Sequence, residues 1–176
     1  MQFTCRDVLA VLGFTLFAAG VSAQGKVPSR GSAADGGGDK ASPIFGVVVP
    51  PGYRRWELIA PAHRPDFDEV RGILGNAIAM KAYREGTLPF PDGAMLAKLA
   101  WKRVPSAEYP VAFVPGAATT VQIMVKDSSK FAATGGWGFG RFVGGKPVDE
   151  AQHTTCFPCH QASVKGHDYV FTRLAP

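Results

Sequence analysis

The sequence has no run of lysine or arginine residues, although it is basic overall. Its net charge of +5 is spread along 176 residues. Nucleic-acid-binding domains gather their positive charge into clusters or stripes, so we expect no nucleic-acid partner. The simple interpretation of this charge is a mildly basic surface. The more specific alternative is a surface that docks an acidic redox partner.

The sequence also lacks an apolar run of comfortable membrane-spanning length. A helix needs about 20 apolar residues to cross a bilayer, and the run at residues 8–20 is shorter. Small residues follow it, which favours a cleaved secretory signal over residues 1–23 and a periplasmic protein; an uncleaved anchor is the alternative. Residues 24–43 are rich in glycine and serine and predict a flexible leader. We expect residues 44–176 to form one domain that does not enter a membrane.

Cysteine is scarce, with three residues in all, and Cys5 falls within the predicted signal. The other two, Cys156 and Cys159, are followed by His160, which completes the pattern Cys-x-x-Cys-His. Two thiols at this spacing can form thioethers to the two vinyl groups of one porphyrin, and the adjacent imidazole can bind its iron. We therefore predict one covalently attached haem c, with His160 as the proximal iron ligand.

Three other kinds of site use similar residues: a thioredoxin-like dithiol, an ordinary disulfide, and a structural zinc site with His153, His160 or His167. Thioredoxin motifs open a helix after an early strand, whereas this motif lies near the C-terminus with no βαβ pattern before it. A structural zinc usually has four Cys or His ligands in recognisable pairs. The haem interpretation is therefore favoured over these alternatives.

No methionine follows the haem motif, although an electron-transfer cytochrome normally has Met or His as a second axial ligand. Met80, Met95 and Met124 fall in predicted core or strand positions, where the simple interpretation is packing. His63 is in a Pro-rich turn, and His153 is too near the haem-binding helix to reach over the ring easily. We infer a five-coordinate iron with an open distal site, which favours small-molecule binding over plain electron transfer.

Short segments of alternating apolar character predict a sheet of mostly antiparallel strands. A helix over residues 77–84 is expected within this pattern, with Asn76 as its N-cap and Gly86 at its end. A short second helix carries the haem motif near the C-terminus. The fold class expected is therefore α+β. The predicted strands are residues 56–60, 67–74, 95–102, 119–125, 137–143 and, at an edge, 169–172.

The predicted strand at residues 95–102 has two faces of different composition. Its odd-numbered residues, from Met95 to Trp101, are expected to face the core. Lys98 lies on the other face between Leu96 and Ala100, so we do not expect that face to be simply exposed to solvent.

Several short motifs resemble the cytochrome P-460 family in their order and approximate spacing. The 21 glycines and 14 prolines would break the four long helices of a cytochrome c-prime, which is the other mono-haem class with a C-terminal motif and an open iron. The cytochrome P-460 family also includes the cytochromes c-prime-beta, which bind gases in an apolar distal pocket. The motifs are Tyr53-Arg54-Arg55-Trp56, Phe67-Asp68-Glu69-Val70-Arg71, Asp92-Gly93 with Lys98, Val125-Lys126-Asp127, Gly136-Trp137-Gly138-Phe139, Cys156 to His160, and Val170-Phe171-Thr172-Arg173.

The resemblance implies roles for three further residues. Lys98 matches the lysine that becomes covalently joined to the porphyrin edge in cytochrome P-460; a solvated strand lysine is the alternative. Arg71 matches the family's distal arginine, which can donate hydrogen bonds to an iron-bound ligand; an outward-facing strand arginine is the alternative. Gln122 stands where members that oxidise hydroxylamine have a carboxylate, and an amide has no useful basicity.

The resemblance therefore implies a periplasmic homodimer that binds hydroxylamine or nitric oxide and oxidises hydroxylamine toward nitrogen oxides, with a redox partner as electron acceptor. Lys98 favours this hypothesis. Gln122 favours the alternative, a protein similar to cytochrome c-prime-beta that binds nitric oxide without turnover.

Overall fold

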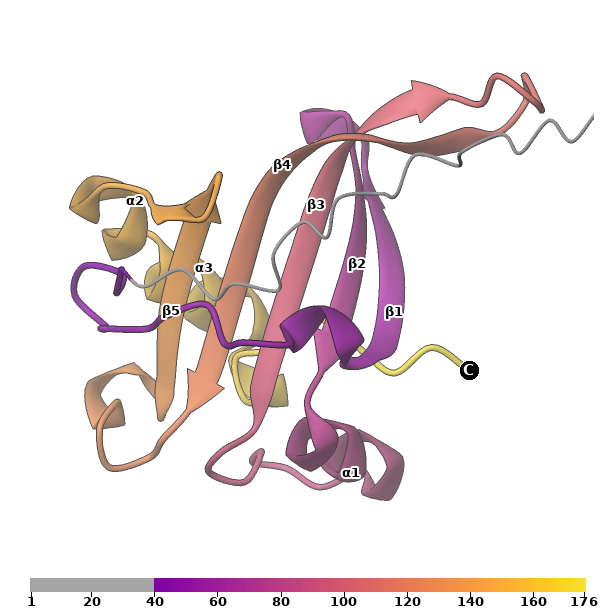
Figure 1. Ribbon diagram of the computed structural model, residues 1–176. Helices are drawn as coiled ribbons and strands as arrows, with labels where there is room; N and C mark the ends of the chain where they lie inside the picture. Colours follow the sequence, from indigo (N-terminus) through magenta and orange to yellow (C-terminus); the bar gives the residue numbers. More distant parts are fainter. Residues whose placement is uncertain (1–39) are drawn as a thin grey trace, which may run out of the picture. The chain divides into compact units, whose positions relative to one another are not determined.

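A six-stranded antiparallel sheet forms the centre of the fold (Figure 1). The computed structural model describes residues 40–176. The predicted signal at residues 1–23, and all of the predicted leader except residues 40–43, lie outside the described residues. Each strand pairs with the next along the chain, which confirms the predicted α+β class with a mainly antiparallel sheet. The strands are β1 (Glu57–Arg64), β2 (Glu69–Gly75), β3 (Met95–Pro105), β4 (Phe113–Lys126), β5 (Trp137–Val143) and β6 (Lys146–Pro147).

Short helices lie before, between and after the strands. No helix within residues 40–176 has the length and apolar character needed to cross a membrane. The last α-helix carries the haem motif and is followed by a single 3-10 turn, η4 (Lys165–His167). The α-helices are α1 (Ala77–Glu85), α2 (Glu150–Thr154) and α3 (Cys156–Val164), and the earlier 3-10 turns are η1 (Tyr53–Arg55), η2 (Pro65–Phe67) and η3 (Ala132–Thr134).

Helix α1 forms where the sequence predicts it, between β2 and β3. The Asn76 side chain accepts a hydrogen bond from the Ala79 N–H at 3.0 Å, which satisfies one of the unpaired N–H groups of the first turn. Its amide nitrogen also donates to the Gly93 carbonyl at 2.8 Å. Gly86 ends the helix with a φ of 64°, a left-handed conformation that glycine adopts at little cost. Asn76 thus begins the helix and ties it to the turn before β3.

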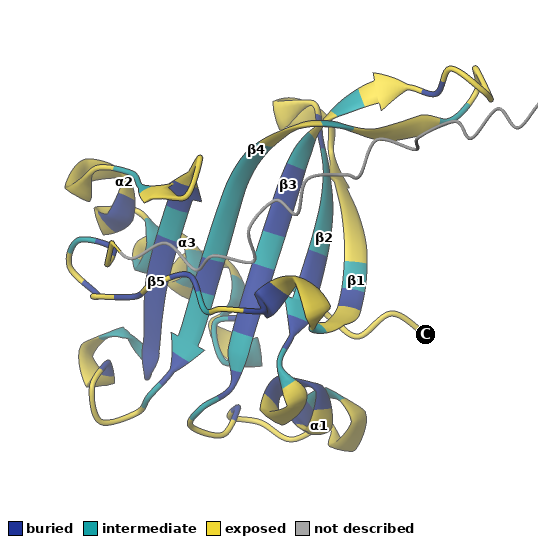
Figure 2. Cartoon of the chain, in the orientation of Figure 1, coloured by how far each residue is buried: buried dark blue, intermediate teal, exposed yellow. Residues whose placement is uncertain are grey.

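Both faces of β3 are covered, which corrects the expectation that only its odd-numbered residues face the core (Figure 2). Ala97 and Leu99 are buried as predicted, but on the opposite face Leu96 and Ala100 are only 4% and 1% exposed. A strand buried on both faces is a nearly continuous apolar run, as residues 95–101 of this strand are apart from Lys98. Lys98 is therefore a cationic side chain among buried apolar neighbours.

Different parts of the chain cover the two faces of the sheet. The segment before β1 packs on one face, where a Cβ added to Gly140 would lie 3.1 Å from Val47. Helix α3 packs on the other face, where His160 contacts the ring of Phe139. Successive strand residues point to opposite faces, so Gly140 and Phe139 mark the two sides. The haem motif therefore lies on the Phe139 side of the sheet.

The edge of the sheet differs from the sequence prediction in two places. Strand β1 continues through Pro61, which an edge strand tolerates because one side of its backbone needs no partner. His63 therefore lies in β1 opposite Val70, and not in a turn. Strand β2 begins after Phe67, which closes the 3-10 turn η2.

Residues 169–172 do not form the predicted edge strand. Tyr, Val, Phe and Thr favour strands intrinsically, but Asp168 and Tyr169 have left-handed φ angles of 46° and 63° that turn the chain away from an extended path. Farther on, the Ala175 N–H donates to the Ile59 carbonyl at 2.9 Å. The C-terminal segment therefore crosses back to β1 without forming a strand of its own.

Candidate haem site

Helix α3 places the three motif side chains on one side. Residues three and four positions apart are neighbours on a helix surface, so Cys159 and His160 lie beside Cys156. Both cysteines are free thiols; Cys156 is partly buried and Cys159 is exposed. Pro158 lies in the first turn, where a missing N–H removes no helical hydrogen bond. The helix thus presents two thiols and an imidazole along one stripe.

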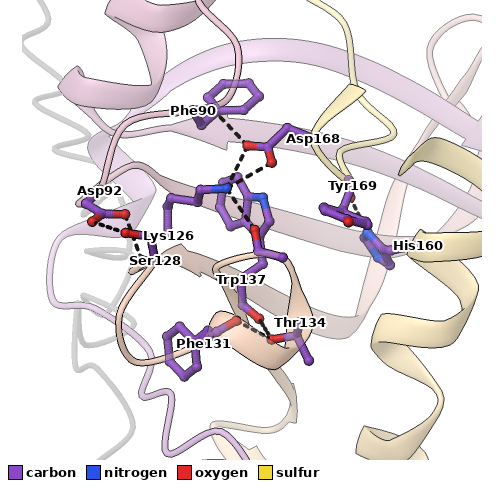
Figure 3. A network of polar contacts seen from close by, with 11 residues as sticks. Phe90, Asp92, Lys126, Ser128, Phe131, Thr134, Trp137, His160, Asp168 and Tyr169 are labelled. Carbon is purple, nitrogen blue, oxygen red and sulfur yellow. Dashed lines mark hydrogen bonds and ion pairs between the residues drawn. The ribbon is translucent and has the colours of Figure 1, made fainter. Parts of the chain in front are cut away.

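His160 is held in the orientation that a metal-binding histidine requires. Its Nδ1–H donates to the Tyr169 carbonyl at 2.7 Å (Figure 3), which leaves the Nε2 lone pair for a metal. The edges of Phe139 and Phe171 pack against the ring, with centroids 5.0 and 4.9 Å away. Burial lowers the pKa of His160 and favours the neutral imidazole, which is the form that binds iron.

His153, considered above as a zinc or axial ligand, is occupied by backbone groups. Its Nδ1–H donates to the Asp149 carbonyl at 2.8 Å, and its Nε2 accepts the Arg141 N–H at 3.1 Å. The side chain is fully buried. His167 is likewise hydrogen-bonded, through Nδ1, to the Val170 carbonyl at 2.9 Å. Within residues 40–176 no group of three or more His, Cys, Asp or Glu side chains is arranged to hold a metal ion.

The sheet brings Arg71, Lys98 and Gln122 together on one face. Lys98 is the register partner of Gln122 across β3 and β4, and the same row continues to Ile73 on β2 and Arg141 on β5. Register partners project from the same face of an antiparallel pair. Arg71 is two residues from Ile73 and therefore shares that face.

The face that carries Lys98 is directed toward the haem motif. Arg141 lies two residues from Phe139, which contacts His160, so the row of Lys98 and Arg141 is on the α3 side. Burial is the main cause of the lowered pKa of His160, and the charge of Lys98 lowers it further. Burial raises the pKa of the Cys156 thiol, while Arg141 and Lys98 act in the opposite direction. The charges of this row therefore act on the ionisable groups of the motif.

Lys98 is unusual because its amine loses its charge near neutral pH. Burial lowers its pKa to about 7, and the neighbouring Arg71 contributes in the same direction. Glu69 partly opposes this shift, and Arg141 adds to it. A deprotonated amine has a free lone pair, which makes it a nucleophile. The alternative of an ordinary solvated lysine does not describe this environment.

Arg71 is held by a carboxylate that the sequence reasoning missed. Its Nε and Nη2 donate to Glu69 Oε2 at 2.9 and 2.6 Å, and the Thr119 hydroxyl donates to the other oxygen at 2.7 Å. The side chains of Arg71 and Glu69 are only 11% and 10% exposed, so Arg71 is not an outward-facing strand arginine. Burial raises the pKa of Glu69, but the hydrogen bonds from Thr119 and Arg71 outweigh it and the net pKa is lowered. The two-residue spacing of Glu69 and Arg71 in a strand was the signal that could have identified this pair.

These residues fit a haem group. The motif supplies two thiols and an imidazole with a free Nε2, and the opposite wall supplies the apolar side chains of Leu96 and Ala100. Arg141 lies in the same cross-strand row as Lys98, and its Nε is a buried N–H donor with no hydrogen-bond partner among residues 40–176. A bound group or an ordered water at this position would satisfy such a donor.

The methionines considered as axial ligands pack in the sheet and core. Met80 is 3% exposed and belongs to the core, as expected. Met124 packs against the core between its register partners Leu96 and Phe139. Met95 is partly buried at the start of β3.

A family model described as Cytochrome P-460 matches residues 50–172, which is nearly the whole described part of the chain. No match is found among curated proteins.

Proposed function

The chain belongs to the cytochrome P-460 family, a family of haem proteins, and we propose that it is a periplasmic mono-haem c-type cytochrome that oxidises hydroxylamine. The N-terminal sequence, with its short apolar run and small residues at 21–23, supports export. The same iron would bind nitric oxide. When bound, the haem supplies a coordination site for a small nitrogenous molecule and accepts electrons that leave to a redox partner.

Covalent attachment is proposed through thioethers to Cys156 and Cys159, with His160 as the iron ligand. The positions of the three side chains on α3 and the hydrogen bond from His160 to the Tyr169 carbonyl support this assignment. After tryptic digestion, one peptide containing residues 156–160 should carry the mass of a haem. A haem that is extracted by acidic organic solvent would contradict covalent attachment.

The proposed distal residues have distinct roles. The contact with Glu69 uses the Nε and Nη2 of Arg71, so the Nη1 donors are the ones proposed to hydrogen-bond a bound ligand. Glu69 keeps this guanidinium in place. The Gln122 amide, opposite Lys98, can orient a ligand or a water but does not accept a proton usefully.

The observation that carries the catalytic proposal is the partly buried amine of Lys98, whose pKa is lowered to about 7, on the wall that faces the motif. We assign it a bond to the porphyrin edge. The new N–C bond replaces one N–H and one C–H bond, so two electrons and two protons pass to an external two-electron oxidant of the peroxide class. A macrocycle modified in this way has altered electronic properties, and its ferrous Soret band should be strongly red-shifted.

Steady-state oxidation of hydroxylamine with an artificial electron acceptor tests the proposal on protein matured with c-type haem. Lys98→Met should remove the red shift and most turnover. Lys102→Met is the matched control, because Lys102 is on the same strand but exposed. Parent protein with attached haem but without turnover would contradict the enzymatic proposal.

Gln122 favours a second candidate function, capture of nitric oxide without turnover. The carboxylate expected of hydroxylamine-oxidising members is absent at this position, and Glu69 is already engaged by Arg71 and Thr119. In that case the parent should bind nitric oxide without oxidising hydroxylamine, and Gln122→Glu should introduce turnover. An unshifted Soret band would favour this candidate.

Assembly as a homodimer is also proposed, on the strength of the family resemblance. Sedimentation equilibrium of the haem-loaded protein at micromolar concentration should give twice the chain mass. A single-chain mass under those conditions would contradict it.

A further inference from the structure

Lys126 and Asp168 form a buried ion pair at the end of β4 (Figure 3). The Lys126 Nζ lies 2.9 Å from both carboxylate oxygens of Asp168. The two side chains are only 5% and 8% exposed. A buried pair of this kind is sensitive to loss of either partner, because the remaining charge is left without compensation.

Each partner of the pair has further contacts that fix its position. Lys126 Nζ also donates to the Gly135 carbonyl at 2.9 Å and lies 5.1 Å from the centre of the Trp137 ring. Asp168 Oδ2 accepts the Phe90 N–H at 2.8 Å. The pair therefore joins β4, the turn before β5 and the segment before β3 to the chain that follows α3.

The backbone after α3 needs such contacts because it is strained. Asp168 and Tyr169 are consecutive non-glycine residues in the left-handed region, with φ angles of 46° and 63°. Residues in this region persist only where surrounding contacts hold them. The Tyr169 ring packs so closely on Gly135 that a Cβ there would lie 2.1 Å from it. The conformation at residues 168–169 is thus held by the ion pair on one side and by Gly135 on the other.

This backbone conformation fixes the position of the Tyr169 carbonyl oxygen. The Tyr169 carbonyl accepts the Nδ1–H of His160 at 2.7 Å. We propose that Lys126 and Asp168 are positioning residues for the proximal histidine, acting through the Tyr169 carbonyl. This inference rests on the proposed function in taking His160 as the iron ligand.

The hydrogen bond at Nδ1 controls how strongly the opposite nitrogen donates to a metal. A good acceptor at Nδ1–H raises the basicity of the imidazole and stabilises the oxidised iron, and loss of such a contact typically costs about 10-fold or more in affinity or activity. If the Tyr169 carbonyl moves away, the iron–histidine bond should weaken. The iron–histidine stretching frequency should then fall, and the reduction potential should rise.

Asp168→Asn is the most selective single variant. Asparagine tolerates the left-handed region and can still accept the Phe90 N–H, so it removes the charge while keeping the backbone preference. It leaves Lys126 buried without its counter-charge, and for this reason the double variant Lys126→Met/Asp168→Asn is prepared in parallel, since it removes both charges at similar volume. Glu85→Gln is the matched control, because it breaks the exposed ion pair of Lys81 and Glu85 on α1.

Resonance Raman spectra of the ferrous proteins and their reduction potentials are the readouts. We expect a lower iron–histidine frequency, a higher potential and about 10-fold weaker binding of an anionic ferric ligand such as cyanide in both variants, with no change in Glu85→Gln. Unchanged frequency and potential in the folded double variant, with parental haem content, would overturn the inference alone. A parent protein with attached haem but no iron–histidine band would overturn both the inference and the assignment of His160.

Discussion

Lys98 and Gln122 face each other across β3 and β4 on the side of the sheet that packs against the haem motif. The one strongly perturbed amine of the site therefore stands beside an amide, in a row that ends at Arg141. The carboxylate of this face lies elsewhere, at Glu69, where it binds Arg71. The chemistry of the site thus depends on which of these groups can bond to a haem held by the motif, or exchange protons with its ligand.

Formation of the Lys98 bond should depend on pH through the amine. Because its pKa is lowered to about 7 by burial and by Arg71, the reactive neutral form increases as the pH rises through 7 and changes little above 9. The rate of cross-linking after addition of peroxide to the haem-loaded protein should rise roughly tenfold between pH 6 and pH 8. Mass spectrometry of the haem peptide measures this rate, and an increase that continued to pH 10 would indicate an unperturbed lysine.

Replacement of Glu69 should destabilise the folded protein in a pH-dependent way. Glu69→Gln weakens the hydrogen bonds to Arg71 and Thr119 and should lower the free energy of unfolding at pH 7 by about 1–3 kcal/mol. The folded-state pKa of Glu69 is lowered, so its contribution is present above the unfolded pKa and is lost as the pH falls through the folded value. The difference between parent and variant should therefore shrink below about pH 4.

Urea unfolding of the haem-loaded proteins at several pH values measures this difference. Glu57→Gln is the control, because its ion pair with Arg84 is exposed on both sides and should contribute less than about 1 kcal/mol. Equal effects of the two substitutions at pH 7 would contradict a special role for Glu69.

Gly135→Ala should be far more damaging than an alanine at another left-handed glycine. Gly135 and Gly144 have similar φ angles of 64° and 56°, but a Cβ at Gly144 meets nothing within 4 Å. Gly144→Ala should cost about 1–2 kcal/mol from backbone strain alone. Gly135→Ala should cost about 1–3 kcal/mol more, because the Tyr169 ring must move. Denaturant unfolding of both variants gives the comparison, and equal losses would show that the ring moves freely.

His153→Ala should destabilise the protein without changing the iron's ligands. The substitution leaves the Arg141 N–H without its acceptor and opens a cavity at a fully buried site, a loss of about 2–4 kcal/mol. The exposed His63 on β1 provides the control, and His63→Ala should stay within about 0.5 kcal/mol of the parent. The absorption spectra of both haem-loaded variants should match the parent. A change of spin state in His153→Ala would indicate that His153 binds the iron.

The parts of the fold that depend on local sequence could be predicted. Helix α1 was predictable because Asn76 and Gly86 mark its ends, and β5 was predictable because its aromatic residues alternate with glycine. The haem motif was predictable because its chemistry is contained in five consecutive residues. Lys98 and Gln122 were named as site residues only through family resemblance; that they lie opposite each other across β3 and β4 is a finding of the structure.

The parts that depend on contacts between distant segments could not be predicted. In the sequence, Glu69 is an ordinary strand carboxylate. Its role depends on the contacts with Thr119 and Arg71 that form only in the folded structure. Residues 169–172 have strand-forming side chains, but the left-handed backbone at Tyr169 is imposed by partners elsewhere in the chain. The burial of both faces of β3 likewise depends on segments that are remote in sequence.

The proposed haem attachment involves one short segment of the chain, whereas the complete haem site is built from segments far apart in the sequence. The two thiols and the imidazole lie within residues 156–160. Their surroundings require four strands and the returning C-terminal segment, whose Ala175 N–H is hydrogen-bonded to the Ile59 carbonyl. Contacts between such distant residues form slowly, since a long loop must close before they contribute. The proposed thioethers can therefore form before the tertiary structure does. A porphyrin already fixed to the motif would then act as an apolar nucleus on which the sheet and the C-terminal segment assemble.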